Sequence, residues 1–527
     1  MNSPSREDAG GPAPIGAAPD RASLPLPPSF GLAADPGTTV LDGGRVLMGG
    51  SPLRLLRVSS RARALIDRWE AGAPVGDRKG EPVLARRLVS AGVFLPRPGS
   101  PVLGPDDVTV VIPVRDRPAQ LARLLSTLDS TLEGTRCLVV DDGSADPARS
   151  RAIAENVGAA VIALPANLGP SAARNAGLAQ AGTPLVAFID SVCVPADGWL
   201  EPLLAHFNDP LVAAVAPRIL PLGVTPPTSL TRYEAVRSSL DRGGRPGLVR
   251  PMSRIPYVPS AALLVRRGAV PDALFDPRLR GGEDVDLVWR LVQAGWDVRY
   301  EPGATVRHDG PTSAGAWLGR RAFYGTTAGP LARRHPRSLA PLHTSLWTAA
   351  VWVLAVARKP LPAAVTLAVS IVVLARRLDG LVDEPVRVAG RIAGGGTARS
   401  ALPALSGLTR AWSPALLLAL CGRKTRKAAA LALLVPAAGD WLGTRGALDP
   451  VRYAALHVAD DVAYGSGVWL GCLRARTVAP LLPRIELRTR MWSTRSLRTQ
   501  LGGRKEPTGE REENGAHNAE QRTTPVR

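Results

Sequence analysis

Charged and polar residues follow two apolar segments that each have the composition of a buried β-strand. These residues are Pro113, Arg115 and Asp116 after the segment 108–112, and Asp141 and Asp142 after the segment 137–140. Carboxylates at the ends of two adjacent strands could recognise the base and the ribose of a nucleotide. Acidic turns are also common without any ligand, so this pattern alone leaves both interpretations open.

A further basic group stands near the start of a predicted helix. Ser171 can cap this helix, and Arg174 and Asn175 lie in its first turn. A helix N-terminus beside a guanidinium suits an anionic diphosphate, which is the leaving part of many activated sugars. The alternative is a capped surface helix whose arginine is simply solvated.

Two more acidic positions could take part in chemistry. Asp190 closes the apolar segment 185–189, where a carboxylate can hold a divalent ion that neutralises a leaving diphosphate. Glu283 and Asp284 follow two glycines and lead into a predicted helix, so one of them could accept the proton of an attacking hydroxyl. The helix dipole alone also stabilises such an acidic cluster. His308 could be a metal or phosphate ligand, or equally a structural histidine.

These residues need a scaffold that brings several strand ends together. Between Val108 and about His308, apolar strand-like segments alternate with segments of helical spacing. This alternation indicates an α/β fold with a doubly wound parallel sheet. Ligands of such a sheet bind beyond the carboxyl ends of its strands, where the polar clusters stand.

The chain divides further by composition. Residues 1–29 are rich in proline, glycine and alanine, and we expect a disordered leader there. Residues 30–95 predict a small winged-helix-like unit made of a hairpin, two helices and a wing. The α/β domain is expected over 106–325, and an apolar helical region over 340–480. The polar tail 495–527 is expected to be disordered.

Composition narrows the class of protein. Of 527 residues, 45% are apolar and 21% are charged, which excludes wholesale disorder, and the four cysteines form no CxxC pair. The net charge of +20 comes almost entirely from 318–527, where 31 basic residues face 13 acidic ones. This excess is interleaved with apolar runs, which favours an anionic membrane surface and disfavours nucleic acid as the partner.

The apolar runs predict how the chain would meet a membrane. The segments 343–357 and 361–375 are each shorter than the roughly 20 residues that a spanning helix needs. We therefore expect re-entrant or interfacial hairpins with basic turns. A soluble helical bundle is the alternative, and the acidic pair Asp460 and Asp461 would suit it, because carboxylates are costly in lipid.

Taken in order, five segments resemble the motifs of the family 2, GT-A-type glycosyltransferases. They are Pro113–Arg117, DDGS at 141–144, the NxG…ARNAG segment at 167–177, Asp190 after its strand, and GGEDVDLVWR at 281–290. Over about 30–480 the chain is similar to the mycofactocin-system glycosyltransferases of actinobacteria, for example through RYEAVRSSLD at 232–241, RAFYGT at 321–326 and DDVAYGSGVW at 460–469. The front unit is similar to the PqqD-like peptide-recognition fold.

The resemblance implies an inverting hexosyltransferase with a GT-A fold at the cytoplasmic face of the membrane. It would move glucose from UDP-glucose to premycofactocin, a redox cofactor made from a ribosomal peptide, and build an oligoglucose chain. The implied donor-binding residues are Pro113, Arg115, Asp116, Asp141, Asp142, Arg174 and Asn175. The implied metal ligands are Asp190 and His308, and the implied base is Asp284 beside Glu283.

The chain departs from the family at one position. Members usually read Asp-Ser-Asp where this chain reads Asp190-Ser191-Val192, and valine cannot bind a metal. Either Asp190 and His308 hold Mg²⁺ or Mn²⁺ with water and the diphosphate, or metal affinity and rate are reduced. The alternative functions are a family 2 enzyme with another acceptor, such as a cell-envelope glycan, and a peptide-binding scaffold with an impaired metal site.

Overall fold

The computed structural model describes residues 12–21, 23–131, 135–336, 338–444 and 446–486. The predicted tail 495–527 lies outside these residues. One helix among those described, Pro360–Leu378, is long and apolar enough to cross a membrane, which by itself is weak evidence for a span.

The N-terminal unit consists of short strands and two helices. Strands β2 (Thr39–Leu41), β3 (Val46–Gly49) and β4 (Arg54–Arg57) form an antiparallel sheet, followed by α1 (Ser60–Glu70) and α2 (Glu81–Ala91). Strand β1 (Gly31–Ala34) pairs with β5 (Phe94–Arg97). The Ser59 side chain caps α1 by accepting from the amide of Ala62. Phe30, Ile66 and Trp69 lie in the core of this unit.

The segment predicted as a disordered leader differs from the prediction in its described part. The amide of Ala18 donates to the carbonyl of Ala294 at 2.9 Å, and the Trp296 indole donates to the carbonyl of Gly16 at 2.9 Å. Leu26 is fully buried. Proline prevents regular structure here, but an irregular segment can still be held by such single anchors, so the prediction is wrong for these residues.

The central domain is built on one sheet with the strand order β10-β14-β11-β13-β9-β6-β7-β8. The strands are β6 (Val108–Val114), β7 (Arg136–Asp141), β8 (Ala160–Ala163), β9 (Leu185–Ile189), β10 (Cys193–Pro195), β11 (Val212–Pro221), β13 (Ala262–Arg266) and β14 (Asp297–His308), with β12 (Gly247–Leu248) paired to β14. Strands β8, β7, β6 and β9 are parallel, as predicted. Strand β13 runs antiparallel to both β9 and β11, so the sheet is mixed. A strand buried on both faces has the same apolar pattern in either direction, which is why its direction was not predictable.

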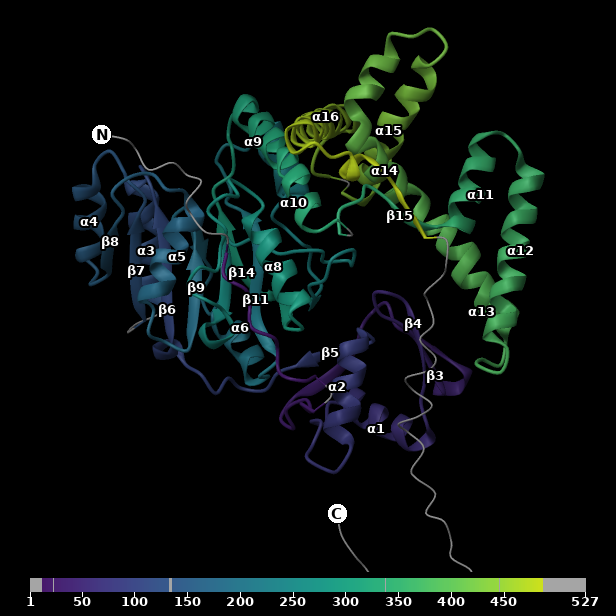
Figure 1. The fold of residues 1–527 in the computed structure, drawn as a ribbon, viewed down its shortest axis with the longest axis horizontal. Helices are drawn as coiled ribbons and strands as arrows, with labels where there is room; N and C mark the ends of the chain where they lie inside the picture. The colour runs from purple at the N-terminus through teal and green to yellow at the C-terminus, as the bar shows by residue number, and fades with distance from the viewer. Residues whose placement is uncertain (1–11, 22, 132–134, 337, 445, 487–527) are drawn as a thin grey trace, which may run out of the picture. The chain divides into compact units, whose positions relative to one another are not determined.

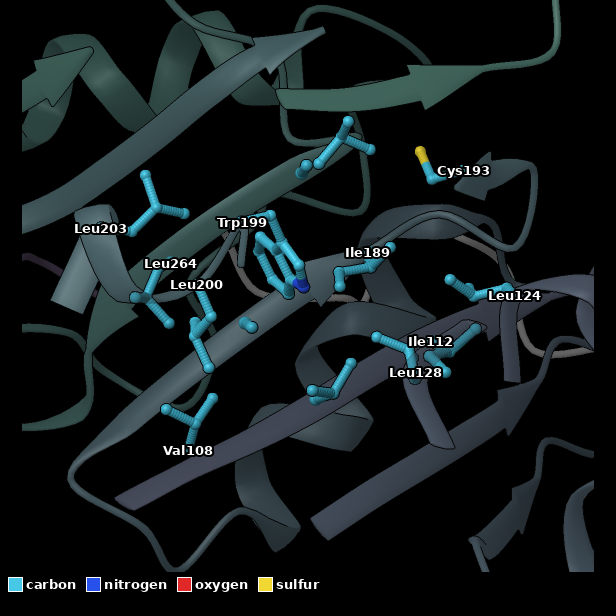
Figure 2. Close-up of a cluster of buried hydrophobic side chains, with 14 of the residues drawn as sticks. Val108, Ile112, Leu124, Leu128, Ile189, Cys193, Trp199, Leu200, Leu203 and Leu264 are labelled. Atoms are coloured by element: carbon cyan, nitrogen blue, oxygen red, sulfur yellow. The ribbon is translucent and has the colours of Figure 1, made fainter. Parts of the chain in front are cut away.

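Helices cover both faces of this sheet (Figure 1). Helices α3 (Pro118–Thr131), α4 (Pro147–Glu155) and α6 (Glu201–Ala205) share one core with Val110 and Ile112. Figure 2 shows part of this core, with Trp199 and Leu200 near the strands that carry Ile112 and Leu264. Helices α5 (Pro170–Gln180) and α8 (Glu283–Gln293) share the other core with Val111. Successive side chains of β6 therefore point to opposite faces.

The region after the sheet is helical. Its main helices are α9 (Ala314–Thr326), α10 (Ala328–Arg334), α11 (Leu346–Val356), α12 (Pro360–Leu378), α13 (Pro385–Ala389), α14 (Gly395–Leu420), α15 (Arg426–Gly443) and α16 (Pro450–Ala475), and β15 (His343–Ser345) pairs with β16 (Arg484–Glu486). The predicted run 361–375 is thus part of a longer helix. Helix α16 packs closely on α9, since a Cβ at Gly467 would lie 2.0 Å from the carbonyl oxygen of Ala322.

A buried polar network joins this helical region to α7 (Ser229–Arg237), which belongs to the central domain. Asp460 accepts a hydrogen bond from the Tyr233 hydroxyl at 3.2 Å and lies 3.2 Å from Nε of Arg321. The neighbouring Asp461 lies 3.8 Å from Nη1 of Arg410. The acidic pair is therefore paired within the protein, which offsets much of the cost of burying it.

Candidate active site

One cavity of about 1940 Å³ contains most of the predicted site residues. Its wall includes Asp142, Arg174, Asp190, Glu283, Asp284 and His308. Pro113 and Arg115 also line it, whereas Asp116, Asp141 and Asn175 do not. The cavity lies beyond the carboxyl ends of β6 and β9, where an α/β sheet places its ligands.

Arg174 occupies the centre of the acidic cluster. Its side chain is almost fully buried on α5, where Nη2 donates to Oδ1 of Asp190 at 2.6 Å and Nη1 donates to Oε1 of Glu283 at 3.1 Å. Burial alone would lower the pKa of Arg174, but the charges of Asp190 and Glu283 raise it, so the guanidinium stays charged. Arg174 thus links the end of β9 to the start of α8 and neutralises much of their charge.

Asp284 has the electrostatics of a general base. Burial raises the pKa of its carboxyl to about 7, and the charge of Glu283 raises it in the same direction. A hydrogen bond from the amide of Val285 to Oδ1, 2.7 Å long, and the charge of Arg174 act against this rise. A carboxylate with a pKa near neutrality can accept a proton during a reaction at physiological pH.

The two aspartates at the end of β7 have different environments. Oδ1 of Asp142 accepts from the amide of Leu168 at 2.7 Å and Oδ2 accepts from the amide of Gly169 at 2.9 Å, so this side chain holds the loop before α5. Asp141 is buried, and its Oδ1 accepts from the amide of Ser144 at 2.7 Å. Its Oδ2 has no hydrogen-bond partner among the described residues.

Asp116 connects the loop after β6 to the turn after β7. Its Oδ1 accepts from the amide of Ala145 at 2.8 Å, and its own amide donates to Oγ of Ser144 at 3.0 Å. The residue has a φ of 53°, a left-handed conformation that aspartate tolerates better than most side chains. About half of the Asp116 side chain is exposed, as is the neighbouring Arg115. This loop can therefore still meet a ligand at its edge.

Asn175 has a structural environment that its predicted donor-binding role does not explain. Its Nδ2 donates to the carbonyl of Phe275 at 2.8 Å, and its Oδ1 accepts from the amide of the same residue at 2.9 Å. Both ends of the amide are thus used on the backbone of one neighbouring residue. Asn175 holds the segment before α8 in place rather than facing the cavity.

The predicted metal ligands form only part of a cation site. Asp190 and His308 line the same cavity, and burial lowers the pKa of His308, which favours the neutral imidazole that a metal requires. Among the described residues, however, no group of three His, Cys, Asp or Glu side chains could hold a metal ion. Val192 offers no ligand, and Asp190 is already paired with Arg174. A hard cation here would take its remaining ligands from water and phosphate.

The cavity also has wall residues that the sequence analysis did not single out as site residues. Tyr257 comes from the loop before β13, Tyr324 from α9, and Arg410 and Tyr464 from α14 and α16. The segments RAFYGT and DDVAYGSGVW, which carry Tyr324 and Tyr464, contributed to the family resemblance. No local sequence pattern indicates that these residues line the same cavity as Asp284.

Comparisons with known proteins agree on the class of enzyme. The family model described as glycosyl transferase family 2 matches residues 109–269. Two strains of Mycobacterium tuberculosis, CDC 1551 / Oshkosh and ATCC 25618 / H37Rv, have a relative named pre-mycofactocin glycosyltransferase, 42% identical over 478 residues, which covers 87% of this chain and 98% of the relative. The succinoglycan biosynthesis protein ExoU of Rhizobium meliloti (strain 1021) is 26% identical over 215 residues, 37% of this chain and 59% of that protein.

Two solved structures have a weaker likeness. GalNAc-T7 with UDP, GalNAc and Mn²⁺ matches at a TM-score of 0.30 and 15% identity, over 43% of this chain and 52% of that one. The mannosyltransferase PcManGT from Pyrobaculum calidifontis, in complex with GDP-Man and Mn²⁺, matches at a TM-score of 0.38 and 17% identity, over 70% of this chain and 90% of that one.

Proposed function

Because this chain belongs to the family of the pre-mycofactocin glycosyltransferases and contains a glycosyl transferase family 2 domain, we propose that it transfers glucose from UDP-glucose to premycofactocin. The chain is a hexosyltransferase. What we propose is the identity of the donor, the identity of the acceptor and the inversion of the anomeric carbon. The observation that carries it is Asp284, a partly buried carboxylate with a raised pKa on the wall of a cavity that also contains Arg174 and Asp190.

The proposed reaction is a single displacement that inverts the anomeric carbon. Asp284 accepts the proton of an acceptor hydroxyl, whose oxygen forms a bond to the anomeric carbon of glucose. The bond between that carbon and the oxygen of the diphosphate breaks, and UDP leaves with the electron pair. The amide-rich start of α5, beyond Gly169, lies on the cavity wall and suits the negative charge of the diphosphate.

Several residues support recognition of the nucleotide. Asp116 follows β6 and Asp141 is the last residue of the adjacent parallel strand β7, and one oxygen of Asp141 has no partner among the described side chains and backbone groups. These carboxylates would serve the uridine, with Asp142 shaping the loop that faces the donor. If a divalent cation takes part, Asp190 and His308 would hold it together with the diphosphate, and it would neutralise charge on the leaving group.

We assign the N-terminal unit to recognition of a peptide. Strand β4 is the edge of its three-stranded sheet, since it pairs with β3 alone within that sheet. An exposed edge can add a strand from an extended peptide through main-chain hydrogen bonds. This supports a role in holding an acceptor of peptide origin near the central domain.

We assign the helical region to the cytoplasmic face of the membrane. Val356 and Leu361 are 85% and 74% exposed, and they flank the basic residues Arg358 and Lys359 between α11 and α12. Leu418 and Leu431, 77% and 63% exposed, flank the basic segment 423–427, which runs from the turn after α14 into the start of α15. Apolar side chains next to a basic turn suit the interface of an anionic membrane.

A direct assay tests the proposed function. Pure protein is incubated with UDP-glucose and premycofactocin, and the products are analysed by mass spectrometry for added hexose. The proposal expects hexose increments on premycofactocin; addition only to another acceptor would contradict it. Because Val192 weakens the metal site, binding of UDP-glucose by calorimetry without any turnover would favour the peptide-binding scaffold instead.

A further inference from the structure

The cavity is larger than its donor side requires. It encloses about 1940 Å³, whereas pockets for a small ligand usually have roughly 300–1,000 Å³. The residues discussed above, from Asp142 to Asp284, account for its donor side. The remaining wall includes residues from the segment before β12, from the loop before β13, and from α9, α14 and α16.

Two stacked tyrosine–arginine pairs stand out on this remaining wall. The guanidinium carbon of Arg410 lies 4.2 Å from the ring centroid of Tyr464, and that of Arg242 lies 4.4 Å from the ring centroid of Tyr257. Nη2 of Arg242 also donates to the Tyr257 hydroxyl at 3.2 Å. Stacking of this kind fixes both side chains of each pair before any ligand arrives.

A third tyrosine connects the pairs to the proposed base. Tyr324 on α9 lines the same cavity, and burial raises the pKa of its phenol while the charges of Asp284 and Tyr257 add to the rise. The charge of Tyr257 also raises the pKa of the Tyr464 phenol. We call the five residues of this surface the tyrosine wall; they are Tyr257, Tyr324, Tyr464, Arg242 and Arg410. The tyrosine wall therefore extends from the vicinity of Asp284 to α14 and α16.

The charge of this wall argues against an anionic ligand at its far end. Arg410 is 3.5 Å from Asp460 and 3.8 Å from Asp461, so two carboxylates offset its charge. Tyr324 and Tyr464 both line the cavity. Tyrosine presents an apolar ring and a polar tip, which together match the apolar faces and the hydroxyls of a sugar ring.

From this geometry we infer that the tyrosine wall is an acceptor-side subsite that binds a saccharide chain extending away from Asp284. The inference rests on the proposed function in one respect, namely that the group transferred is a sugar. It adds that the helices α14 and α16 help to select the acceptor. The wall would hold sugar residues already attached while the next hydroxyl reaches the base.

The test measures binding without turnover on the full-length protein. Calorimetry in the presence of saturating UDP compares a linear glucose tetrasaccharide, cellotetraose, with free glucose. We expect the tetrasaccharide to bind at least about tenfold more tightly than glucose, since several rings meet the wall. Absence of tetrasaccharide binding, or equal affinity for glucose, would overturn the inference.

Variants on one helix sharpen the test. Tyr464→Ala should weaken tetrasaccharide binding by about tenfold or more, whereas Leu473→Ala, an exposed position on the same helix, should leave it within about threefold of the wild type. Tyr257→Phe, which removes only a hydroxyl, covers the case in which Tyr464→Ala fails to fold, and should weaken binding by about threefold to tenfold. Wild-type affinity in the folded tyrosine variants would refute the subsite. The binding assay involves no transfer of glucose, so it tests the subsite alone. A failure to glucosylate premycofactocin in the separate transfer assay would instead contradict the proposed function.

Discussion

Nη2 of Arg174 lies 2.6 Å from Oδ1 of Asp190, so the carboxylate predicted to bind a metal already has a cationic partner supplied by α5. The same guanidinium reaches Glu283 through its other terminal nitrogen. A planar fork with two donors can satisfy both carboxylates at once, which a lysine ammonium cannot do with the same geometry. This relationship positions the end of β9 relative to the start of α8, which carries the proposed base.

Removing this cation should weaken both the fold and the donor site. Arg174→Ala leaves Asp190 and Glu283 without their partner, and breaking a buried pair costs up to about 3–5 kcal/mol of unfolding free energy. The cost should fall toward the lower end, because 27% of the Asp190 side chain is exposed and can be hydrated. Thermal and denaturant unfolding measure the loss, and calorimetry measures UDP-glucose affinity. Arg115→Ala, at a half-exposed position, is the stability control and should change unfolding by less than about 0.5 kcal/mol. Unchanged stability in Arg174→Ala would contradict the buried bridge.

The pH dependence of turnover should report the proposed base. The carboxyl of Asp284 has a pKa raised to about 7, and only its deprotonated form accepts a proton. The value of kcat/KM should therefore be low below this pKa, rise through it, and level off above it. Glu283→Gln removes a charge that raises the pKa of Asp284, so the rising limb should move to lower pH. If the pH at which kcat/KM rises is the same in this variant as in the wild type, the titrating group is not Asp284.

Position 192 should control metal affinity. Val192→Asp restores a carboxylate beside Asp190 and should raise Mn²⁺ affinity by about tenfold or more, because a hard oxygen replaces a water ligand. Calorimetry or paramagnetic resonance of bound Mn²⁺ provides the readout without turnover. Val192→Asn, which offers a neutral oxygen of the same size, is the matched control and should give a smaller gain. If wild-type activity survives exhaustive chelation, a metal is not needed here.

Much of the fold could be predicted because its signals are local. The apolar runs of β6 and β9, the serine cap of α1 and the strand-end positions of Asp142 and Asp190 are all properties of short segments. The direction of β13 was not predictable, since its apolar pattern is the same in both orientations. Nor was the length of α14 predictable, because this helix continues through Pro403 and Pro414, residues that usually end a helix.

The site shows the same division between local and tertiary information. A strand end followed by an acidic residue indicates where Asp190 lies, but no spacing indicates that Arg174 pairs with it. Asn175 stands in the first turn of α5 beside Arg174, yet its amide holds Phe275, a residue about a hundred positions away. The tyrosine wall is the extreme case, because its members come from the loops before β12 and β13 and from the helices α9, α14 and α16.

The basic turns should determine membrane binding. Replacing Arg423, Lys424, Arg426 and Lys427 by glutamine should weaken binding to anionic liposomes by on the order of 10²–10³-fold, since each basic residue near such a surface contributes about 1 kcal/mol. Arg452→Gln, at an exposed position of α16, should have a much smaller effect. Cosedimentation with anionic and neutral liposomes measures the difference. Wild-type protein that stays in the supernatant without detergent, and does not bind anionic liposomes, would contradict the membrane assignment.

The most direct test of the whole account is the initial rate of hexose transfer from UDP-glucose to premycofactocin by wild type and Asp284→Asn, with UDP affinity measured on the same samples. Asparagine keeps the shape of the side chain but cannot accept the proton. The account predicts hexose addition by the wild type and a loss of about 10²–10⁴-fold in the variant, with UDP affinity nearly unchanged. Near-normal transfer by Asp284→Asn would contradict the central claim that this carboxylate is the base.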